Sequence, residues 1–78
     1  MPYYFFDWNA GREEYVLQHG VTAAEFEEVV MNPLRVDVSR TSAHHIAFGE
    51  TSTGKQLACV YEEFDDTVYP VTAFEFNS

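Results

Sequence analysis

The spacing of apolar residues changes at Pro33, from a helical period before it to a strand period after it. Phe26, Val29 and Val30 form one apolar stripe at helical spacing, with glutamates mostly off the stripe. Pro33 ends this segment because the residue before a proline avoids the α region. From Leu34 to Val38 the sequence LRVDV alternates apolar and polar residues, which indicates a half-buried strand.

The helix before Pro33 begins at a tight joint. Gly20 stands where the C′ residue of a preceding helix is expected, since glycine adopts the left-handed conformation without steric cost. Thr22 and Glu25 have the spacing of a capping box, in which each side chain accepts from the other residue's backbone N–H. Val21 and Phe26 flank the box at the spacing of a hydrophobic staple. The stretch therefore predicts the end of one helix, a tight joint and the start of a second helix.

Turn-forming residues divide the rest of the chain into short strands. A hairpin turn is predicted at Ser52–Lys55 and an acidic turn within Glu62–Thr67. Pro70 cannot donate to a ladder, so it indicates an edge or a bulge. The predicted elements are a strand at Tyr3–Trp8, helices at about Ala10–His19 (with Asn9 as N-cap) and Ala23–Met31, and strands at Leu34–Val38, His45–Glu50, Leu57–Phe64 and Thr67–Phe76.

This order, β-α-α-β-β-β-β, is typical of an α+β fold. The expected architecture is two N-terminal helices packed on one face of a curved, mainly antiparallel sheet of four to five strands. A chain of 78 residues is too short for two hydrophobic cores, so residues 1–78 are expected to form a single domain.

Acidic residues dominate the charge of the chain. Thirteen Asp and Glu against four Lys and Arg give a formal net charge of −9. This excess disfavours tight binding of nucleic acid and of anionic membranes, and it favours basic partners. Cys59 is the only cysteine, which fits a reducing compartment. Without a signal-type apolar segment or the ~18 apolar residues of a membrane span, a cytoplasmic protein with no membrane contact is expected.

Several titratable residues have structural interpretations. His19 lies at a predicted helix C-terminus, where the helix dipole favours a cation. His44 and His45 are adjacent, so they point to opposite faces of a strand and do not readily share a metal. The carboxylates of Glu62–Asp66 lack the spacing of a calcium loop and fit a solvated turn. Cys59 alternates with apolar neighbours, as a core residue does.

Short motifs follow one another along nearly the whole chain. An aromatic run ends in Trp8, HGVT starts at His19, HIAFGETSTGKQLACVY starts at His45, and VYPVTAF starts at Val68. In order and spacing these motifs resemble the BrnT family of bacterial toxins, and the chain is also similar to short acidic relatives that end in YPVTAYE. The resemblance implies a RelE-like fold and ribonuclease activity within a toxin–antitoxin pair.

The resemblance also implies candidate catalytic residues. Arg12 falls at the family Lys of the first helix if one helical residue is dropped, and His19 matches the His of the His-Gly-Val motif. His44 falls near a family Arg, and Lys55 follows the glycine of the family turn. RNA cleavage needs a general base, a general acid and cationic stabilisation, so the candidates are His19, Arg12, His44 and Lys55, with Arg12 and Lys55 as phosphate contacts. No metal-binding or cofactor-binding residues are predicted.

Most basic residues of the family pattern are replaced. Glu50 follows Gly49 where the family often has a basic residue, and Phe74 stands in place of an Arg. If all four basic residues touched phosphate, the salt slope on single-stranded RNA would be only about −3. Two functions therefore stay open. The chain is either a toxin-like protein with weak or lost ribonuclease activity and a small antitoxin as partner, or a non-catalytic acidic interaction module that binds a basic protein.

For the interaction module, the sequence suggests an acidic face made by Glu62–Asp66 with Glu25, Glu27 and Glu28. A homodimer through an edge strand is a further alternative, because an unpaired strand edge can accept another strand.

Overall fold

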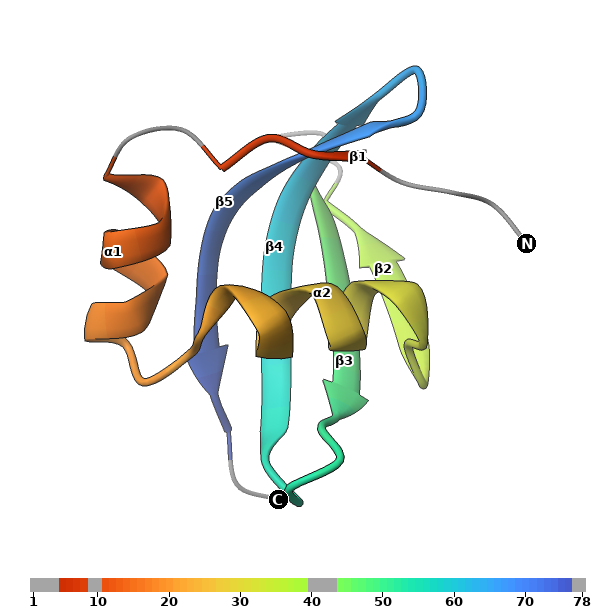
Figure 1. Ribbon diagram of the computed structural model, residues 1–78. Coiled ribbons are helices and arrows are strands. Elements are labelled where there is room, and N and C mark those ends of the chain that lie inside the picture. Colours follow the sequence, from red (N-terminus) through yellow and green to blue (C-terminus); the bar gives the residue numbers. More distant parts are fainter. Residues whose placement is uncertain (1–4, 9–10, 40–43, 77–78) are drawn as a thin grey trace.

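The computed structural model describes residues 5–8, 11–39 and 44–76, and it has two helices and a five-stranded sheet in the described part of the chain (Figure 1). The predicted α+β class and the order β-α-α-β-β-β-β are confirmed. The elements are β1 (Phe5–Phe6), α1 (Arg12–Gln18), α2 (Ala23–Met31), β2 (Arg35–Val38), β3 (His45–Glu50), β4 (Gln56–Phe64) and β5 (Thr67–Glu75). The predictions for Tyr3, Tyr4, Asn9, Ala10 and the link Arg40–Ala43 lie outside the described residues.

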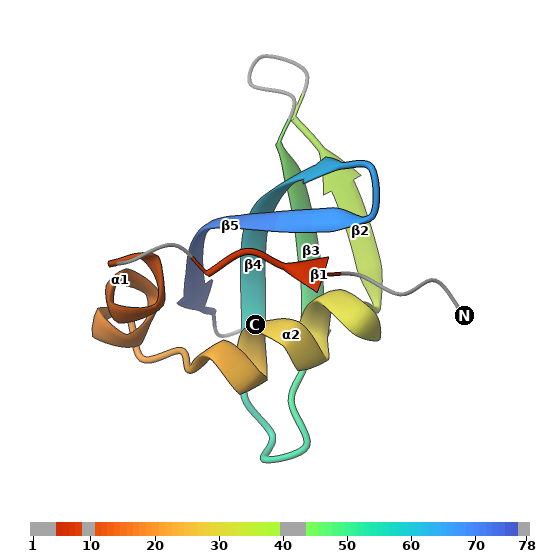
Figure 2. The ribbon, with the colours of Figure 1, turned by 45° about the horizontal axis from the view of Figure 1, so that its top comes forward.

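The sheet has the strand order β1-β5-β4-β3-β2. Its last four strands in sequence pair antiparallel, whereas β1 pairs parallel with β5, with Phe5 opposite Thr67. The sheet is therefore mixed. Both helices lie on one face of it, and β4 and β5 curve along their length so that their hairpin end bends away from the plane of β3 (Figure 2).

The joint between the helices has the predicted chemistry. Gly20 has φ 85°, the N–H of Val21 donates to the Val16 carbonyl at 3.0 Å, and the N–H of Gly20 donates to the Leu17 carbonyl at 2.9 Å. These two bonds form a Schellman motif. The capping box is also present, because the Thr22 hydroxyl accepts from the Glu25 N–H and the Glu25 carboxylate accepts from the Thr22 N–H. The joint therefore fixes where α1 ends and α2 begins.

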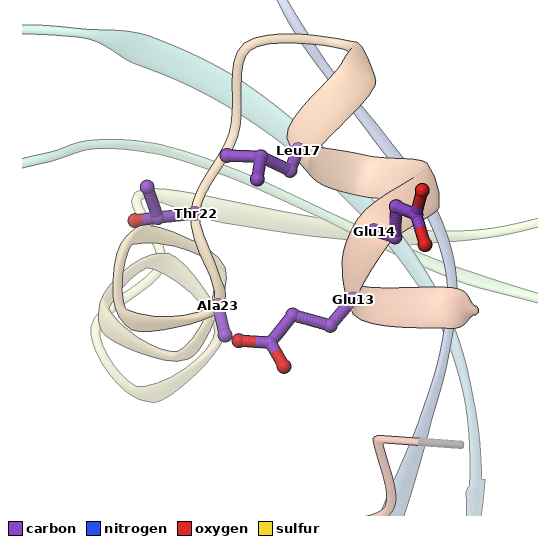
Figure 3. A pocket seen from close by; sticks show the side chains of 5 residues that line it. All are labelled: Glu13, Glu14, Leu17, Thr22 and Ala23. Carbon is purple, nitrogen blue, oxygen red and sulfur yellow. The ribbon is translucent and has the colours of Figure 1, made fainter. Parts of the chain in front are cut away.

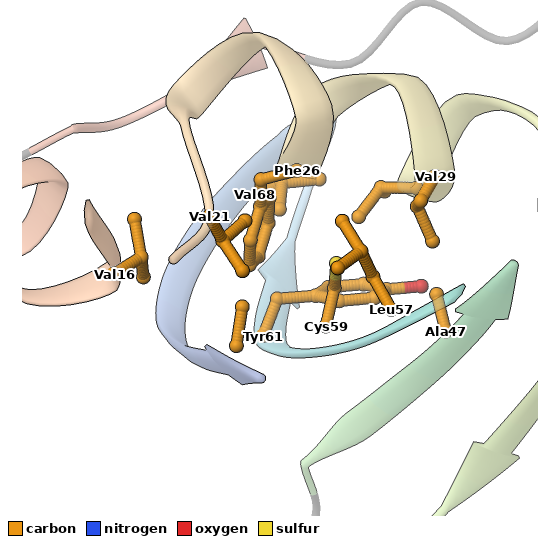
Figure 4. Packing of buried hydrophobic residues seen from close by; sticks show 11 residues of the cluster. Val16, Val21, Phe26, Val29, Ala47, Leu57, Cys59, Tyr61 and Val68 are labelled. Atoms are coloured by element: carbon orange, nitrogen blue, oxygen red, sulfur yellow. The ribbon is translucent and has the colours of Figure 1, made fainter. Parts of the chain in front are cut away.

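The core lies between α2 and the centre of the sheet. Phe26 and Val29 point from α2 toward Leu57 and Cys59 of β4, and all four side chains are at most 1% exposed (Figure 4). The remaining members of the buried cluster are Val16, Val21, Val30, Ala47, Tyr61, Val68 and Ala73. The prediction that Cys59 is a core residue is confirmed, and burial raises its pKa to about 12.

Aromatic rings attach β1 to this core. The Trp8 and Phe6 rings meet Phe26 edge-on, with centroids 5.1 and 6.4 Å away. The Trp8 indole N–H also donates to the Glu27 carboxylate at 2.8 Å. Because Trp8 turns toward α2, the described strand ends at Phe6 and does not reach the predicted Trp8.

Two further predicted elements need correction. Helix α1 begins at Arg12 and not near Ala10, because Gly11 adopts a left-handed conformation with φ 88° and forms the N-cap without a side-chain hydrogen bond. The strand predicted at Leu34–Val38 was expected to bury its apolar side chains, and this expectation is wrong. Val36 and Val38 are 43% and 58% exposed, because α2 packs mainly on β3 and β4.

The bulge predicted at Pro70 is confirmed. Tyr61 pairs with Pro70 and Val60 pairs with Thr72, so Val71 is an extra residue on β5. At the following hairpin end, Asp65 has φ 56° and lies in the exposed acidic turn, in agreement with its predicted turn role.

Candidate functional site

A cleft of about 330 Å³ lies between α1 and the first turn of α2. Its lining residues are Glu13, Glu14, Leu17, Thr22 and Ala23. Glu13 and Leu17, one helical turn apart, point from α1 toward the start of α2, where Thr22 and Ala23 lie (Figure 3). The Schellman joint sets this geometry, because it turns the chain sharply after α1 and brings the start of α2 next to α1.

The cleft combines an apolar floor with an acidic rim. Leu17 is 55% exposed, although it is a large apolar side chain. Among the described residues, neither Glu13 nor Glu14 has a hydrogen-bonding or ion-pair partner. Unpaired carboxylates beside exposed apolar surface suit a cation that carries an aliphatic stem, such as a Lys or Arg side chain.

The glutamates of α2, in contrast, are used within the chain. Glu27 accepts from Trp8, and Glu28 accepts from the Ser52 N–H at 3.0 Å. Glu25 belongs to the capping box, and its pKa is lowered first by the Thr22 backbone hydrogen bond and then by Lys55. All three carboxylates of α2 named for the predicted acidic face therefore have a partner within the chain, and whether this face binds a basic protein stays a prediction. Glu62–Asp66 are exposed, as expected, at the β4–β5 hairpin end.

Lys55 ties the β3–β4 turn to the helix joint. Its Nζ donates to the Gly20 carbonyl at 3.1 Å and lies 3.2 Å from a Glu25 carboxylate oxygen. The turn itself is closed by Thr51, whose hydroxyl accepts from the Lys55 N–H at 3.1 Å. Lys55 therefore stabilises the end of α1 and the start of α2, and its charge is already paired.

Arg12 and His19 lie on one exposed row of α1. The Arg12 guanidinium lies 5.7 Å from the Tyr15 ring centroid, and the Tyr15 ring meets the His19 ring at 4.9 Å. Arg12 also donates to the Val71 carbonyl at 2.9 Å, beside the bulge of β5. Seven helical residues place Arg12 and His19 roughly 10 Å apart along the axis, with Tyr15 between them.

His44 lies at the other end of the hairpin. It is half-buried just before β3, and its Nε2 is 3.8 Å from a Glu62 carboxylate oxygen. Lys55 lies opposite Thr51, seven residues after His44, so the strand separates His44 from Lys55 by roughly 23 Å. The neighbouring His45 stacks on Tyr61 at 5.3 Å, and its Nδ1 is enclosed without a hydrogen-bond partner among the described residues.

The structure therefore brings only some of the candidate catalytic residues near one another. His19, Arg12 and Lys55 surround α1 and the joint after it, whereas His44 is remote from them. Each Lys and Arg side chain among the described residues has an acceptor within the chain. Arg12 and Lys55 donate to backbone carbonyls, and Arg35 pairs with Asp37 at 2.6 Å. Arg40 lies outside the described residues.

The α1–α2 cleft was not predicted from the sequence. Its signal was present in the sequence, because Glu13 and Leu17 have i, i+4 spacing and a glycine joint follows them. What the sequence did not show is that the glutamates of α2 have partners within the chain, whereas Glu13 and Glu14 of α1 have none among the described residues.

No protein-family model matches the chain, and neither a curated protein nor a solved structure does. The resemblance to BrnT-like toxins therefore stays a prediction based on the motifs alone.

Two further observations concern the described residues. No three His, Cys, Asp or Glu side chains among them gather in a way that could hold a metal ion. Neither α1 nor α2 is long and apolar enough to cross a membrane.

Proposed function

We propose that this protein is a non-catalytic interaction module whose α1–α2 cleft binds a basic segment of a partner protein. The observation that carries the proposal is the cleft itself, which is lined by exposed Leu17 and by Glu13 and Glu14, two glutamates without a hydrogen-bonding or ion-pair partner among the described residues. The net charge of −9 draws a basic segment to the molecule from a distance.

In the bound state, a Lys or Arg stem of the partner packs on Leu17 and Ala23. Its charged end lies at Glu13 and Glu14. Long basic side chains commonly divide in this way between apolar surface and a charged group. An exposed ion pair contributes only about 0–1 kcal/mol, so the apolar floor supplies selectivity over simple charge attraction.

The test uses a fluorescent helix-forming Lys/Leu peptide as the probe, with a Glu/Leu peptide of the same length as its control. Binding is measured by anisotropy near physiological salt. The double variant Glu13→Lys/Glu14→Lys is compared with Glu63→Lys/Asp66→Lys, which changes the charge equally at the distant hairpin end. We expect the first variant to weaken binding by about tenfold or more and the second by much less.

Two further measurements separate the cleft from general attraction. Leu17→Asn, which removes apolar surface without adding charge, should also weaken binding. Amide chemical shifts should move at Leu17, Thr22 and Ala23 when the peptide is added. Equal weakening by both charge variants, or shifts confined to Glu62–Asp66, would show that the cleft is not the binding site.

A second proposal is that the chain is the toxin-like member of a toxin–antitoxin pair. It is supported by the Arg12–Tyr15–His19 row and by Lys55 at the Gly20 carbonyl, so that three of the four candidate residues lie along α1 or at the joint after it. His19 is exposed, and its imidazole is the side chain of this group that can serve as a general acid or a general base.

This second proposal is tested by growth. Expression of the chain alone in a bacterial host should arrest growth, and His19→Ala should abolish the arrest at equal soluble expression. Arg12→Lys serves as a milder change at the phosphate-contact position. Normal growth at confirmed expression of the wild-type chain would refute the toxin proposal and leave the interaction module untouched.

A further inference from the structure

The strand β2 forms an open edge of the sheet. It pairs with β3 on one side, and no described segment lies along its other side (Figure 1). Leu34, Val36 and Val38 are 82%, 43% and 58% exposed. Val36 and Val38 project to one face of the strand because side chains alternate along it, and Leu34 comes directly before its first residue. An exposed aliphatic stripe at a sheet edge is a surface on which another strand can be added.

The backbone of this edge is also available. The Ser39 N–H donates to the carbonyl of His44, which lies directly across the β2–β3 ladder. Along an antiparallel strand, every second residue directs its backbone hydrogen bonds to the same neighbouring strand. Counting back from Ser39, the backbone groups of Asp37 and Arg35 therefore bond to β3. The N–H and C=O groups of Val36 and Val38 therefore point outward.

We propose that a second copy of this chain adds to β2, antiparallel, with Val36 opposite Val36 of the second copy. In this register Arg35 lies opposite Asp37 of the second copy, and Leu34 lies opposite Val38. The pattern Arg-Val-Asp is thus complementary to itself when one strand is reversed. Two hydrogen bonds join the Val36 residues across the two-fold axis, and two ion pairs flank them.

The neighbouring registers are disfavoured by like charges. A shift by two residues in one direction places Asp37 opposite Asp37, and the other direction places Arg35 opposite Arg35. Directly opposed like charges destabilise a strand pair, whereas opposite charges stabilise it. Within one chain Arg35 already lies 2.6 Å from Asp37, so the four charges of the dimer form an alternating network.

A second copy fits this edge better than an unrelated strand, because the complementarity involves both the charges and the aliphatic stripe of the same segment. The contact is small, since β2 has four residues, and it falls below the roughly 1,000 Å² of a stable interface. The dimer is therefore weak and reversible. It is independent of the cleft, because α1 packs on β5, three strands away from β2.

The test measures the mass of the full chain in solution by sedimentation over a range of concentrations, at physiological salt. The wild-type chain should shift from monomer to dimer. Val36→Pro removes the outward N–H without removing a bond to β3, since proline is tolerated at such edge positions. Arg35→Asp and Asp37→Arg should each weaken association by about tenfold or more, because they oppose like charges.

A mixing experiment decides the register. Arg35→Asp and Asp37→Arg are each expected to be monomeric alone. An equimolar mixture should form a heterodimer, since every charge then meets its opposite. This rescue arises between chains, so it cannot come from repair of the Arg35–Asp37 pair within one chain. Asp66→Arg, at the exposed hairpin end, is the charge control and should dimerise as the wild type does or better.

Circular dichroism of each variant confirms that it is folded before its mass is interpreted. A wild-type chain that stays monomeric at the highest concentration would overturn the proposal. So would a dimer that persists in Val36→Pro and in both charge variants, because it would use another surface. Failure of the peptide probe at the α1–α2 cleft has no bearing on these outcomes.

Discussion

Gly49 of β3 lies against helix α2. A Cβ atom added at this position would lie 3.1 Å from Cγ1 of Val29 and 3.7 Å from the Asn32 carbonyl oxygen. Val29 is 1% exposed and has a β-branched side chain with one strongly preferred rotamer in a helix. Gly49→Ala therefore requires α2 to move away from β3 by a few tenths of an ångström.

Two opposing effects set the size of the change. Overpacking of a close-packed core costs about 1–3 kcal/mol. Replacing glycine by alanine also restricts the unfolded chain and stabilises by about 0.4–1 kcal/mol where the backbone is compatible. The overpacking is larger, so we expect a net loss of about 1 kcal/mol. For a domain of this length, that loss lowers Tm by about 4–8 °C.

Urea unfolding followed by tryptophan fluorescence measures the effect, since Trp8 packs against Phe26 beside the contact. The decisive comparison is Gly49→Ala in the background of Val29→Ala, which removes the obstructing methyl groups. There the added methyl should be neutral or stabilising, a coupling of about 1–2 kcal/mol. Gly54→Ala is the control, because its Cβ would meet nothing within 4 Å and its cost comes from φ 93° alone.

The reasoning would be refuted by either of two results. Gly49→Ala could leave the free energy of unfolding unchanged or raise it. Alternatively, it could cost the same amount whether residue 29 is valine or alanine, which would place the strain elsewhere.

Three further predictions concern charge and burial. Glu25→Ala should cost about 1 kcal/mol at pH 7 through loss of the capping box, and Glu25→Gln should cost less because glutamine can also accept from Thr22. Since the folded-state pKa of Glu25 is lowered, its charge stabilises the fold above the ordinary pKa of glutamate, so the difference between wild type and Glu25→Gln should vanish as the pH falls through the folded-state pKa. Cys59, whose pKa is raised to about 12, should react with a disulfide reagent at pH 8 only when the fold opens. Its labelling should be slower than in the urea-unfolded chain by about a thousandfold. Rapid, complete labelling in native buffer would contradict its burial. Added NaCl up to about 0.5 M should raise Tm, because it screens the mutual repulsion behind the net charge of −9, and a fall in Tm would show that the internal ion pairs dominate.

Features that depend on neighbours in sequence could be predicted well. The capping box, the left-handed Gly20 and the bounds of α2 follow from short-range hydrogen bonding and from the backbone preferences of particular residues. The bulge beside Pro70 follows from the missing N–H of proline. The exception was the start of α1, because nothing in the sequence showed that Gly11 would adopt a left-handed conformation.

Features that depend on distant partners could not be predicted in this way. Alternation from Leu34 to Val38 indicates a strand with two unlike faces, but it does not show whether a helix covers the apolar face. Likewise, the glutamates of α2 look alike in sequence, and only the fold shows that Trp8, Ser52 and Lys55 occupy them. For this reason the proposed binding site uses the glutamates of α1 and not those of α2.

The pairing of β1 with β5 has a consequence for synthesis of the chain. Phe5 and Thr67 are neighbours in the sheet, yet 61 residues lie between them in the sequence. Val68 and Ala73 of β5 also complete the core beneath the helices. During synthesis, β5 leaves the ribosome after α1, α2 and the β3–β4 hairpin. Until β5 is available, the edge of β4 that pairs with it stays exposed. We therefore expect this domain to acquire its stable fold only after β5 has left the exit tunnel, and to depend until then on speed of translation or on chaperones to avoid pairing with other chains.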